Sequence, residues 1–126
     1  LPSVDAVHAL LADGKWADND RLARAMQPAL TRLAARYFLH AKAVERGEKS
    51  AGVAKPFDPV ARFHLGNGAR VERINMLADT SSNGFKQSYG LMVNYLYDPG
   101  SIEANFEAFA RAGSINASSA VRRAGR

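Results

Sequence analysis

The residue best suited to proton chemistry in this chain is His64, within the motif Phe-His-Leu-Gly-Asn-Gly-Ala at residues 63–69. An unperturbed imidazole titrates near about pH 6.5, so it can donate or accept a proton at physiological pH. No His, Asp or Glu lies three or four positions from His64, which excludes a two-ligand metal site on one helix. Spacing alone also allows the commoner role of a lone histidine, in packing or capping.

Two other side chains could act with this imidazole. Asn67 follows three residues after His64, and its amide could orient the ring or hold a carbonyl oxygen of a ligand; its alternative role is to cap a turn. Tyr97 lies at the end of a predicted strand, where a hydroxyl can hold an imidazole in place, although strand tyrosines ordinarily serve packing. His8 and His40 have no partner at metal-ligand spacing, and we expect a surface or packing role for His8.

A short helix and two strands must position these residues. Asp58 as N-cap and Pro59 at the first helical position predict a helix that places Val60, Phe63, His64 and Asn67 on one face. Residues 69–78 predict a strand with Val71, Arg73, Asn75 and Leu77 on one side and Ile74 among the side chains on the other. Residues 88–97 predict a second strand, in which Tyr89, Leu91, Val93 and Tyr95 alternate with Gly90, Met92, Asn94 and Leu96.

Helical patterns occupy both ends of the chain. Ser3 predicts the start of a helix that ends at Asp13-Gly14, and residues 18–20 predict the start of a longer one that runs to about Arg46 and breaks or kinks at Pro28. Residues 47–55 read as a polar loop. Ser101 predicts the cap of a helix that Gly113 ends, and residues 114–123 predict a last short helix. The fold class is therefore α+β, mostly helical with two antiparallel strands.

Composition limits the function further. The chain has 126 residues, a net charge of +5 and no cysteine, which excludes disulfides and thiolate nucleophiles. No apolar run approaches the ~20 residues that span a bilayer. A basic balance suits a phosphate-bearing ligand, nucleic acid or an anionic surface, or is simply a solvated surface. Because no helix combines a basic stripe with stacking aromatic residues, we expect neither a nucleic-acid nor a membrane partner.

Two strands alone are marginally stable in water. The sequence therefore predicts that they form the edge of a larger sheet whose other strands lie upstream in a longer protein. The start at Leu1 rather than Met agrees with that expectation.

Several motifs in the same order resemble the C-terminal region of the malonyl-CoA decarboxylase family. They are residues 63–69, Glu-Arg-Ile-Asn-Met-Leu-Ala-Asp at 72–79, and Gln-Ser-Tyr-Gly-Leu-Met-Val-Asn-Tyr-Leu-Tyr at 87–97. Shorter segments at 33–38, 58–62 and 117–121 fit the same family. The resemblance runs from about Leu30 to Val121, and linked motifs in order are a more specific signal than any one of them.

The resemblance implies that residues 1–126 are the C-terminal portion of a catalytic domain with a GNAT-type acyltransferase fold, preceded in the whole protein by a helical domain and by the first part of the catalytic domain. It implies decarboxylation of malonyl-CoA to acetyl-CoA and carbon dioxide without a metal or organic cofactor. His64 corresponds to the family's proton donor. Tyr97 belongs to the surroundings of its active site, and a serine or threonine upstream is the other catalytic residue. The main loop that binds the CoA phosphates also lies upstream.

This chemistry suits the residues. A malonyl thioester carries its own electron sink, so loss of carbon dioxide leaves an enolate that needs an oxyanion donor and a proton at C2. His64 can supply that proton, Tyr97 or Asn67 can orient the ring, and Phe63 is a candidate apolar wall. We expect Asn67 and His64 to contact the substrate.

Other functions remain open at this point. The alternatives are another acyl-CoA enzyme of the same fold, such as an acyltransferase, and a non-catalytic basic binding module. We further expect a cytoplasmic homo-oligomer that needs the upstream part of the same protein, the fragment alone being inactive.

Overall fold

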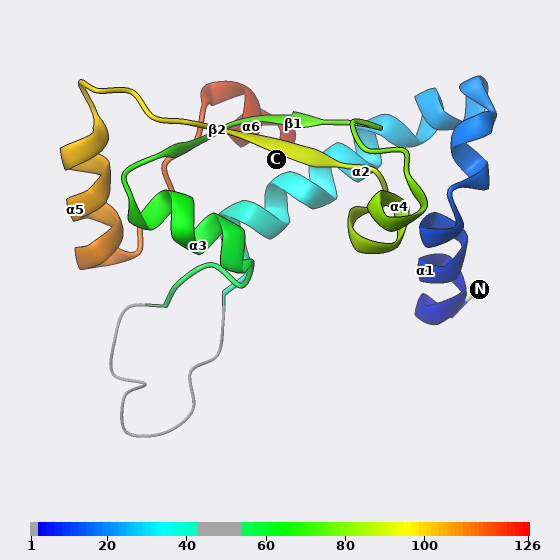
Figure 1. Cartoon of the computed structure of the whole chain (residues 1–126), viewed down its shortest axis with the longest axis horizontal. Helices are drawn as coiled ribbons and strands as arrows, with labels where there is room; N and C mark the ends of the chain where they lie inside the picture. The colour runs from blue at the N-terminus through cyan, green and yellow to red at the C-terminus, as the bar shows by residue number, and fades with distance from the viewer. Residues whose placement is uncertain (1–2, 43–53) are drawn as a thin grey trace.

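The computed structural model describes residues 3–42 and 54–126 of the chain. A two-stranded antiparallel ribbon crosses the molecule, with helices beside it and at both of its ends (Figure 1). The elements in chain order are α1 (Val4–Asp13), the 3-10 helix η1 (Lys15–Asp18), α2 (Asp20–His40), α3 (Pro59–Gly66), β1 (Arg70–Asn75), α4 (Ser82–Ser88), β2 (Met92–Leu96), α5 (Ile102–Ala112) and α6 (Ser119–Ala124). This architecture confirms the predicted α+β class.

Capping residues start most of the helices where the sequence predicted them. The Ser3 hydroxyl accepts a hydrogen bond from the Ala6 amide at 3.1 Å, and the Asp58 carboxylate accepts one from the Ala61 amide at 2.8 Å. Each bond satisfies an N–H group that has no partner inside its helix. The prediction that Ser101 caps α5 with its side chain is wrong. Ser101 occupies the N-cap position of α5, but its hydroxyl donates to the Asp98 carboxylate at 3.2 Å instead of accepting from the helix.

The predicted break at Pro28 does not occur, because α2 is one helix from Asp20 to His40. Pro28 is exposed, so water can hydrate the carbonyl group one turn earlier that loses its N–H partner. The helix ends at His40, before the predicted end near Arg46, because Ala41 is already extended. The predicted helix beyond residue 42 and most of the predicted polar loop lie outside the described residues.

The second strand begins later than the sequence predicted. Residues 82–88 form α4, and Tyr89 caps this helix in the left-handed conformation with φ 56°. Gly90 follows with φ 83°, so neither residue can belong to a strand. The alternation of side chains in residues 88–91 therefore does not correspond to β-structure, and the strand proper is Met92–Leu96.

A β-bulge in β1 changes which side chains share a face. Val71 pairs with Tyr95 and Arg73 pairs with Asn94, which leaves Glu72 as the extra residue between them. Directly opposite residues of a sheet share a face. Ile74 pairs with Val93 and so lies on the same face as Val71, opposite to the predicted alternation. Both side chains contact one apolar cluster, which is the physical gain of the bulge.

This cluster is one of two that make up the core. It contains the buried residues Ala35, Ala61, Leu65, Val71, Phe109, Ile115 and Val121. The second cluster joins Trp16, Ala23, Leu30 and Phe85 at the other end of α2. α2 contributes to both clusters and so ties the two ends of the molecule together.

The two edges of the ribbon differ. On the side away from β2, the Val71 amide donates to the Asn116 carbonyl at 2.8 Å, and the Ser118 amide donates to the Val71 carbonyl at 2.9 Å. Across residues 3–42 and 54–126, β2 pairs with β1 alone, so its second edge carries no strand there. None of the described helices is both long and apolar enough to cross a membrane.

Candidate active site around His64

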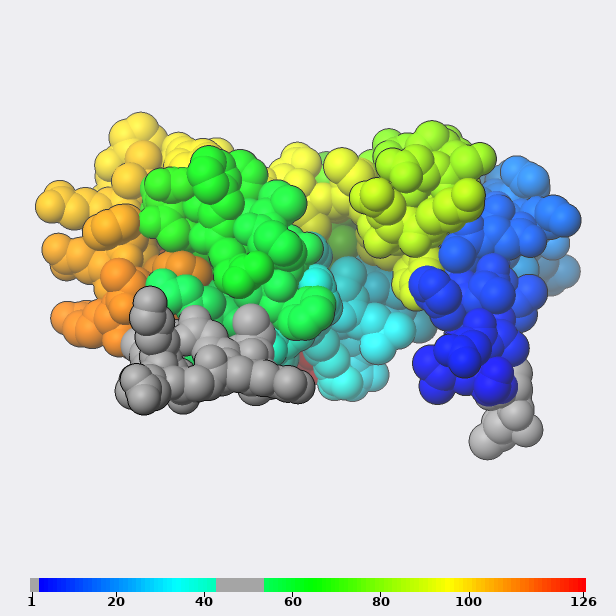
Figure 2. All heavy atoms as spheres, turned by 60° about the horizontal axis from the view of Figure 1, so that its bottom comes forward, coloured from blue at the N-terminus to red at the C-terminus, as the bar shows by residue number. Residues whose placement is uncertain are grey.

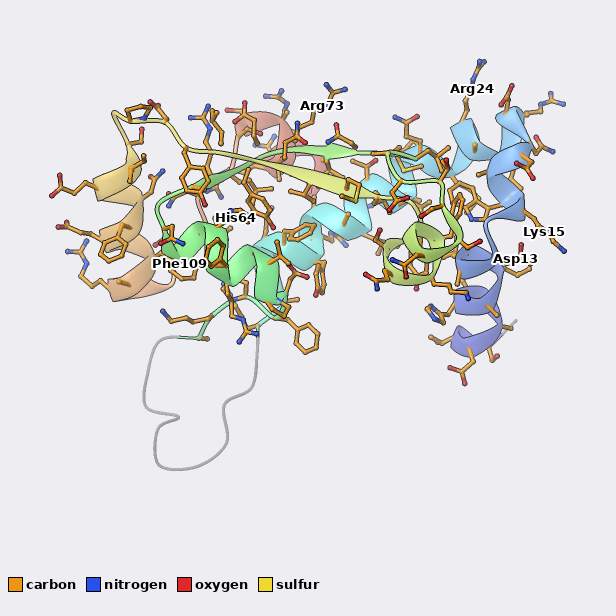
Figure 3. All side chains as sticks on the ribbon, in the orientation of Figure 1. Asp13, Lys15, Arg24, His64, Arg73 and Phe109 are labelled. Carbon is orange, nitrogen blue, oxygen red and sulfur yellow. The ribbon has the colours of Figure 1, made fainter. Side chains whose placement is uncertain are left out.

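The backbone of His64 is fixed by α3 and by the turn that ends it. Ala61 and Leu65 are completely buried and anchor one side of this helix in the core, while His64 lies at its partly exposed flank. The His64 carbonyl accepts hydrogen bonds from the Asn67 and Ala69 amides, both at 3.1 Å. Figure 3 shows the His64 side chain on the side of α3 that faces the ribbon. α3 itself lies at the surface next to α5 (Figure 2).

The structure brings His64 and Tyr97 together across 33 residues of sequence. The Nδ1 atom of His64 lies 2.6 Å from the Tyr97 hydroxyl oxygen, a short hydrogen bond. Tyr97 follows directly after β2 and is 40% exposed, so this contact lies where a ligand can reach it. Either partner can donate, because a tyrosine hydroxyl is both donor and acceptor and the imidazole has two tautomers. The bond occupies Nδ1 and leaves Nε2 as the nitrogen available for chemistry.

Tyr95 makes a second contact with the same imidazole. Its ring stacks on His64 with a centroid distance of 4.4 Å and an interplanar angle of 22°. Tyr95 lies in β2 and Tyr97 lies two positions later, directly after the strand, and both side chains reach the His64 ring. Phe63 and Tyr97 meet the imidazole with their edges, at interplanar angles of 78° and 66°. His64 is therefore surrounded by three aromatic rings, one of which covers its face.

Asn67 does not orient the imidazole through a hydrogen bond, which is one of the two roles that the sequence suggested for it. Its side-chain amide donates to the Phe63 carbonyl at 2.8 Å and so caps α3. Tyr97, not Asn67, is the residue that bonds the imidazole. Asn67 is exposed near His64 at the end of the same helix, and its amide oxygen has no protein partner within the described segments.

Burial controls the protonation of the tyrosine beneath His64. Desolvation raises the pKa of Tyr95 well above its ordinary value, and the negative charge of Asp58 raises this pKa further. Burial, with a smaller contribution from Asp58, also raises the pKa of Tyr37 on α2. Both phenols therefore stay neutral near neutral pH, so Tyr95 places no phenolate charge beside the imidazole.

Sequence reasoning gave Tyr95 only a packing role. A signal existed, because Tyr95 stands two positions before Tyr97 in the predicted strand, where alternation places both side chains on one face. The pairing of that face with α3 depends on contacts across about 30 residues, which spacing along one element does not reveal.

A second histidine–tyrosine pair lies far from His64. The Nδ1 atom of His8 on α1 is 2.5 Å from the Tyr89 hydroxyl at the end of α4, with the rings edge to face. This pair joins two surface helices, which agrees with the packing role expected for His8. It lacks a stacked ring, and so provides a natural comparison for the His64–Tyr97 pair.

The arrangement suits a proton donor more than a metal or a nucleophile. Across the segments that the structure covers, no three His, Cys, Asp or Glu side chains gather as metal ligands would. A hydrogen-bonded imidazole with one free nitrogen, in a partly apolar aromatic surrounding, can deliver a proton to a bound carbon or oxygen.

Comparison with known proteins shows which family this chain is similar to. Residues 3–125 match the family model described as the malonyl-CoA decarboxylase C-terminal domain. The rat protein named malonyl-CoA decarboxylase, mitochondrial, is 46% identical over 96 residues, which are 76% of this chain and 18% of the rat protein.

Solved structures show the same similarity. The malonyl-CoA decarboxylase of Rhodopseudomonas palustris is 50% identical, with a TM-score of 0.79 over 98% of this chain and 27% of that structure. The corresponding structure from Agrobacterium vitis is 44% identical, with a TM-score of 0.77 over 100% of this chain and 29% of its own. The chain thus spans less than a third of the length of each of these relatives.

Proposed function

Because this chain belongs to the malonyl-CoA decarboxylase family, we propose that it forms part of an enzyme that converts malonyl-CoA to acetyl-CoA and carbon dioxide. The observation that carries the proposal is the hydrogen bond between His64 and Tyr97, within the segment that matches the family. We assign His64 as the proton donor and Tyr97 as the residue that orients it.

The reaction needs one bond broken and one proton delivered. The bond between C2 and the carboxylate carbon breaks, carbon dioxide leaves, and the electron pair is delocalised into the thioester as an enolate. Nε2 of a protonated His64 then donates its proton to C2, which gives the methyl group of acetyl-CoA. The neutral imidazole that remains takes up a proton from solvent for the next turnover.

The bond to Tyr97 suits both states of His64. In the imidazolium, Nδ1–H donates to the Tyr97 oxygen while Nε2–H faces the substrate. After Nε2 loses its proton, the same Nδ1–H bond selects the neutral tautomer with a free Nε2, ready to be protonated again. Tyr97 therefore holds the ring through the cycle without rotation.

The remaining machinery is assigned to the upstream part of the same protein. An upstream serine or threonine would stabilise the enolate oxygen, and an upstream loop would hold the CoA phosphates. The free edge of β2 supports a larger sheet that this upstream part completes, with residues 1–126 as the C-terminal portion of a GNAT-type catalytic domain. The fragment alone would then lack half of the site and be inactive.

The test of the function is an assay of the intact protein with malonyl-CoA labelled at the free carboxyl carbon. We expect labelled carbon dioxide and acetyl-CoA in equal amounts. Transfer of the acyl group to an added amine without carbon dioxide would favour the acyltransferase alternative. No turnover of any thioester, together with a salt-dependent affinity for nucleic acid, would favour a basic binding module.

A change at Tyr97 tests the orienting role. Tyr97→Phe removes the hydroxyl and keeps the ring. We expect kcat of the intact enzyme to fall about tenfold, because the loss of one orienting hydrogen bond typically reduces a rate by that much. Tyr89→Phe removes the equivalent hydroxyl from the pair at His8 and should leave kcat within about twofold of the wild type. Equal kcat values for the two variants would contradict the assignment.

The compartment and assembly are further proposals. We infer a cytoplasmic protein, with support from the two solved relatives, both from bacteria, whereas the rat relative is mitochondrial by name. The homo-oligomeric state stays a prediction, which light scattering of the intact protein can test.

A further inference from the structure

We propose that Tyr95 is a positioning residue for His64, whose ring face fixes the plane of the imidazole during proton transfer. This role rests on the proposed decarboxylase function. It concerns the aromatic ring of Tyr95 and not its hydroxyl.

Two contacts of different kinds restrain the imidazole. The hydrogen bond to Tyr97 fixes the position of one ring atom, Nδ1, but the ring could still tilt about that atom. The stack on Tyr95, with planes 22° apart, opposes that tilt because any large rotation would drive imidazole atoms into the phenol ring. The position and the plane of His64 are thus set by two neighbouring side chains of one strand face.

Tyr95 is well anchored for this purpose. It is half-buried, packs against the main apolar cluster, and pairs in the sheet with the completely buried Val71. By contrast, Phe63, which meets the imidazole with its edge, is 64% exposed and has no comparable support. Of the rings around His64, Tyr95 is therefore the one whose own position the core determines.

The hydroxyl of Tyr95 has no part in this role. Throughout residues 3–42 and 54–126, no hydrogen bond connects the Tyr95 hydroxyl to another group of the protein, whereas that of Tyr97 bonds His64. Two adjacent positions on one strand face thus divide the work, with Tyr97 supplying a polar atom and Tyr95 supplying a flat surface. A phenylalanine at residue 95 should serve as well as tyrosine.

The plane of the imidazole matters because the proton is delivered along a fixed direction. The N–H vector of Nε2 lies in the ring plane, so a tilted ring aims its proton away from C2. Proton transfer needs heavy-atom contact in a narrow range of geometry, and small errors of position are costly. Loss of the stack should therefore slow the chemical step and leave substrate binding intact.

The test compares three variants of the intact enzyme. We expect Tyr95→Phe to keep kcat within about twofold, and Tyr95→Leu to lower kcat by about tenfold or more with KM within about twofold. The solvent deuterium isotope effect on kcat should rise in Tyr95→Leu and not in Tyr95→Phe, because proton transfer then limits the rate. A merely structural loss would reduce the amount of folded enzyme without changing this isotope effect. Tyr95→Met provides the same comparison with a longer aliphatic chain should Tyr95→Leu unfold.

Each outcome has a distinct meaning. Equal losses in the Phe and Leu variants, wild-type kcat in the Leu and Met variants, or reduced kcat with an unchanged isotope effect would each overturn the role of Tyr95. Absence of carbon dioxide release by the wild-type enzyme would instead overturn the proposed function.

Discussion

Replacing His64 with asparagine in the full-length enzyme is expected to lower kcat for carbon dioxide release by about a hundredfold or more, the usual scale of general acid catalysis. Asparagine keeps a polar side chain that can still bond the Tyr97 hydroxyl, but it cannot donate a proton near neutral pH. Release of labelled carbon dioxide at saturating malonyl-CoA measures the effect, and the unfolding temperature of the variant checks that the fold is retained.

The chain provides a matched control in its other histidine–tyrosine pair. His8→Asn makes the same chemical change next to Tyr89 and should leave kcat within about twofold of the wild type, since distant sites act independently. His64→Asn retaining most of the wild-type activity would rule out His64 as the proton donor. A comparable loss in both variants would point to a general effect on stability.

The largest expected effect on stability comes from Gly68→Ala. Gly68 is buried with φ +90°, and a Cβ atom at this position would lie 2.5 Å from the Ile102 carbonyl oxygen. The left-handed strain and the clash with backbone together should lower the free energy of unfolding by about 3 kcal/mol. Urea denaturation followed by circular dichroism measures this change.

Gly66→Ala is the matched control within the same motif. Gly66 ends α3, and a Cβ atom there would meet only the Phe109 ring at an ordinary 3.7 Å. Because alanine favours helix, we expect stability to stay the same or to rise by up to about 1 kcal/mol. A loss at residue 66 as large as that at residue 68 would show that the motif does not tolerate any added volume, and that the backbone conformation of Gly68 is not the cause.

Local chemistry made most helix starts predictable. Asp58 followed by Pro59 marks the start of α3, and the observed bond from the Ala61 amide to Asp58 is the interaction on which that prediction depends. Caps of this kind involve residues three apart, so the sequence alone contains both partners. The same reasoning placed His64 on the correct helix, next to the buried Leu65.

Features that depend on partners elsewhere in the fold were not predictable in this way. Tyr89 alternates with its neighbours as a strand residue would, but the hydrogen bonds at the end of α4 place it in a left-handed cap. The stack of Tyr95 on His64 requires β2 and α3 to be side by side, which no local pattern encodes. The fold class and the candidate residues His64 and Tyr97 were therefore open to sequence reasoning, and the stacking geometry around the imidazole was not.

The extra residue Glu72 determines how β1 would respond to the loss of one residue. It allows Val71 and Ile74, three positions apart, to point into the same core, and Val71 is the strand partner of Tyr95. An in-frame loss of the Glu72 codon would leave Val71 and Ile74 two positions apart, so strict alternation would keep both side chains on the core face. The loss would instead remove the ion pair of Glu72 with Arg70 and the hydrogen bond that the Ser118 hydroxyl donates to the Glu72 carbonyl. The pairing of β1 with β2, and not the number of residues between Val71 and Ile74, therefore determines which side chains face the core.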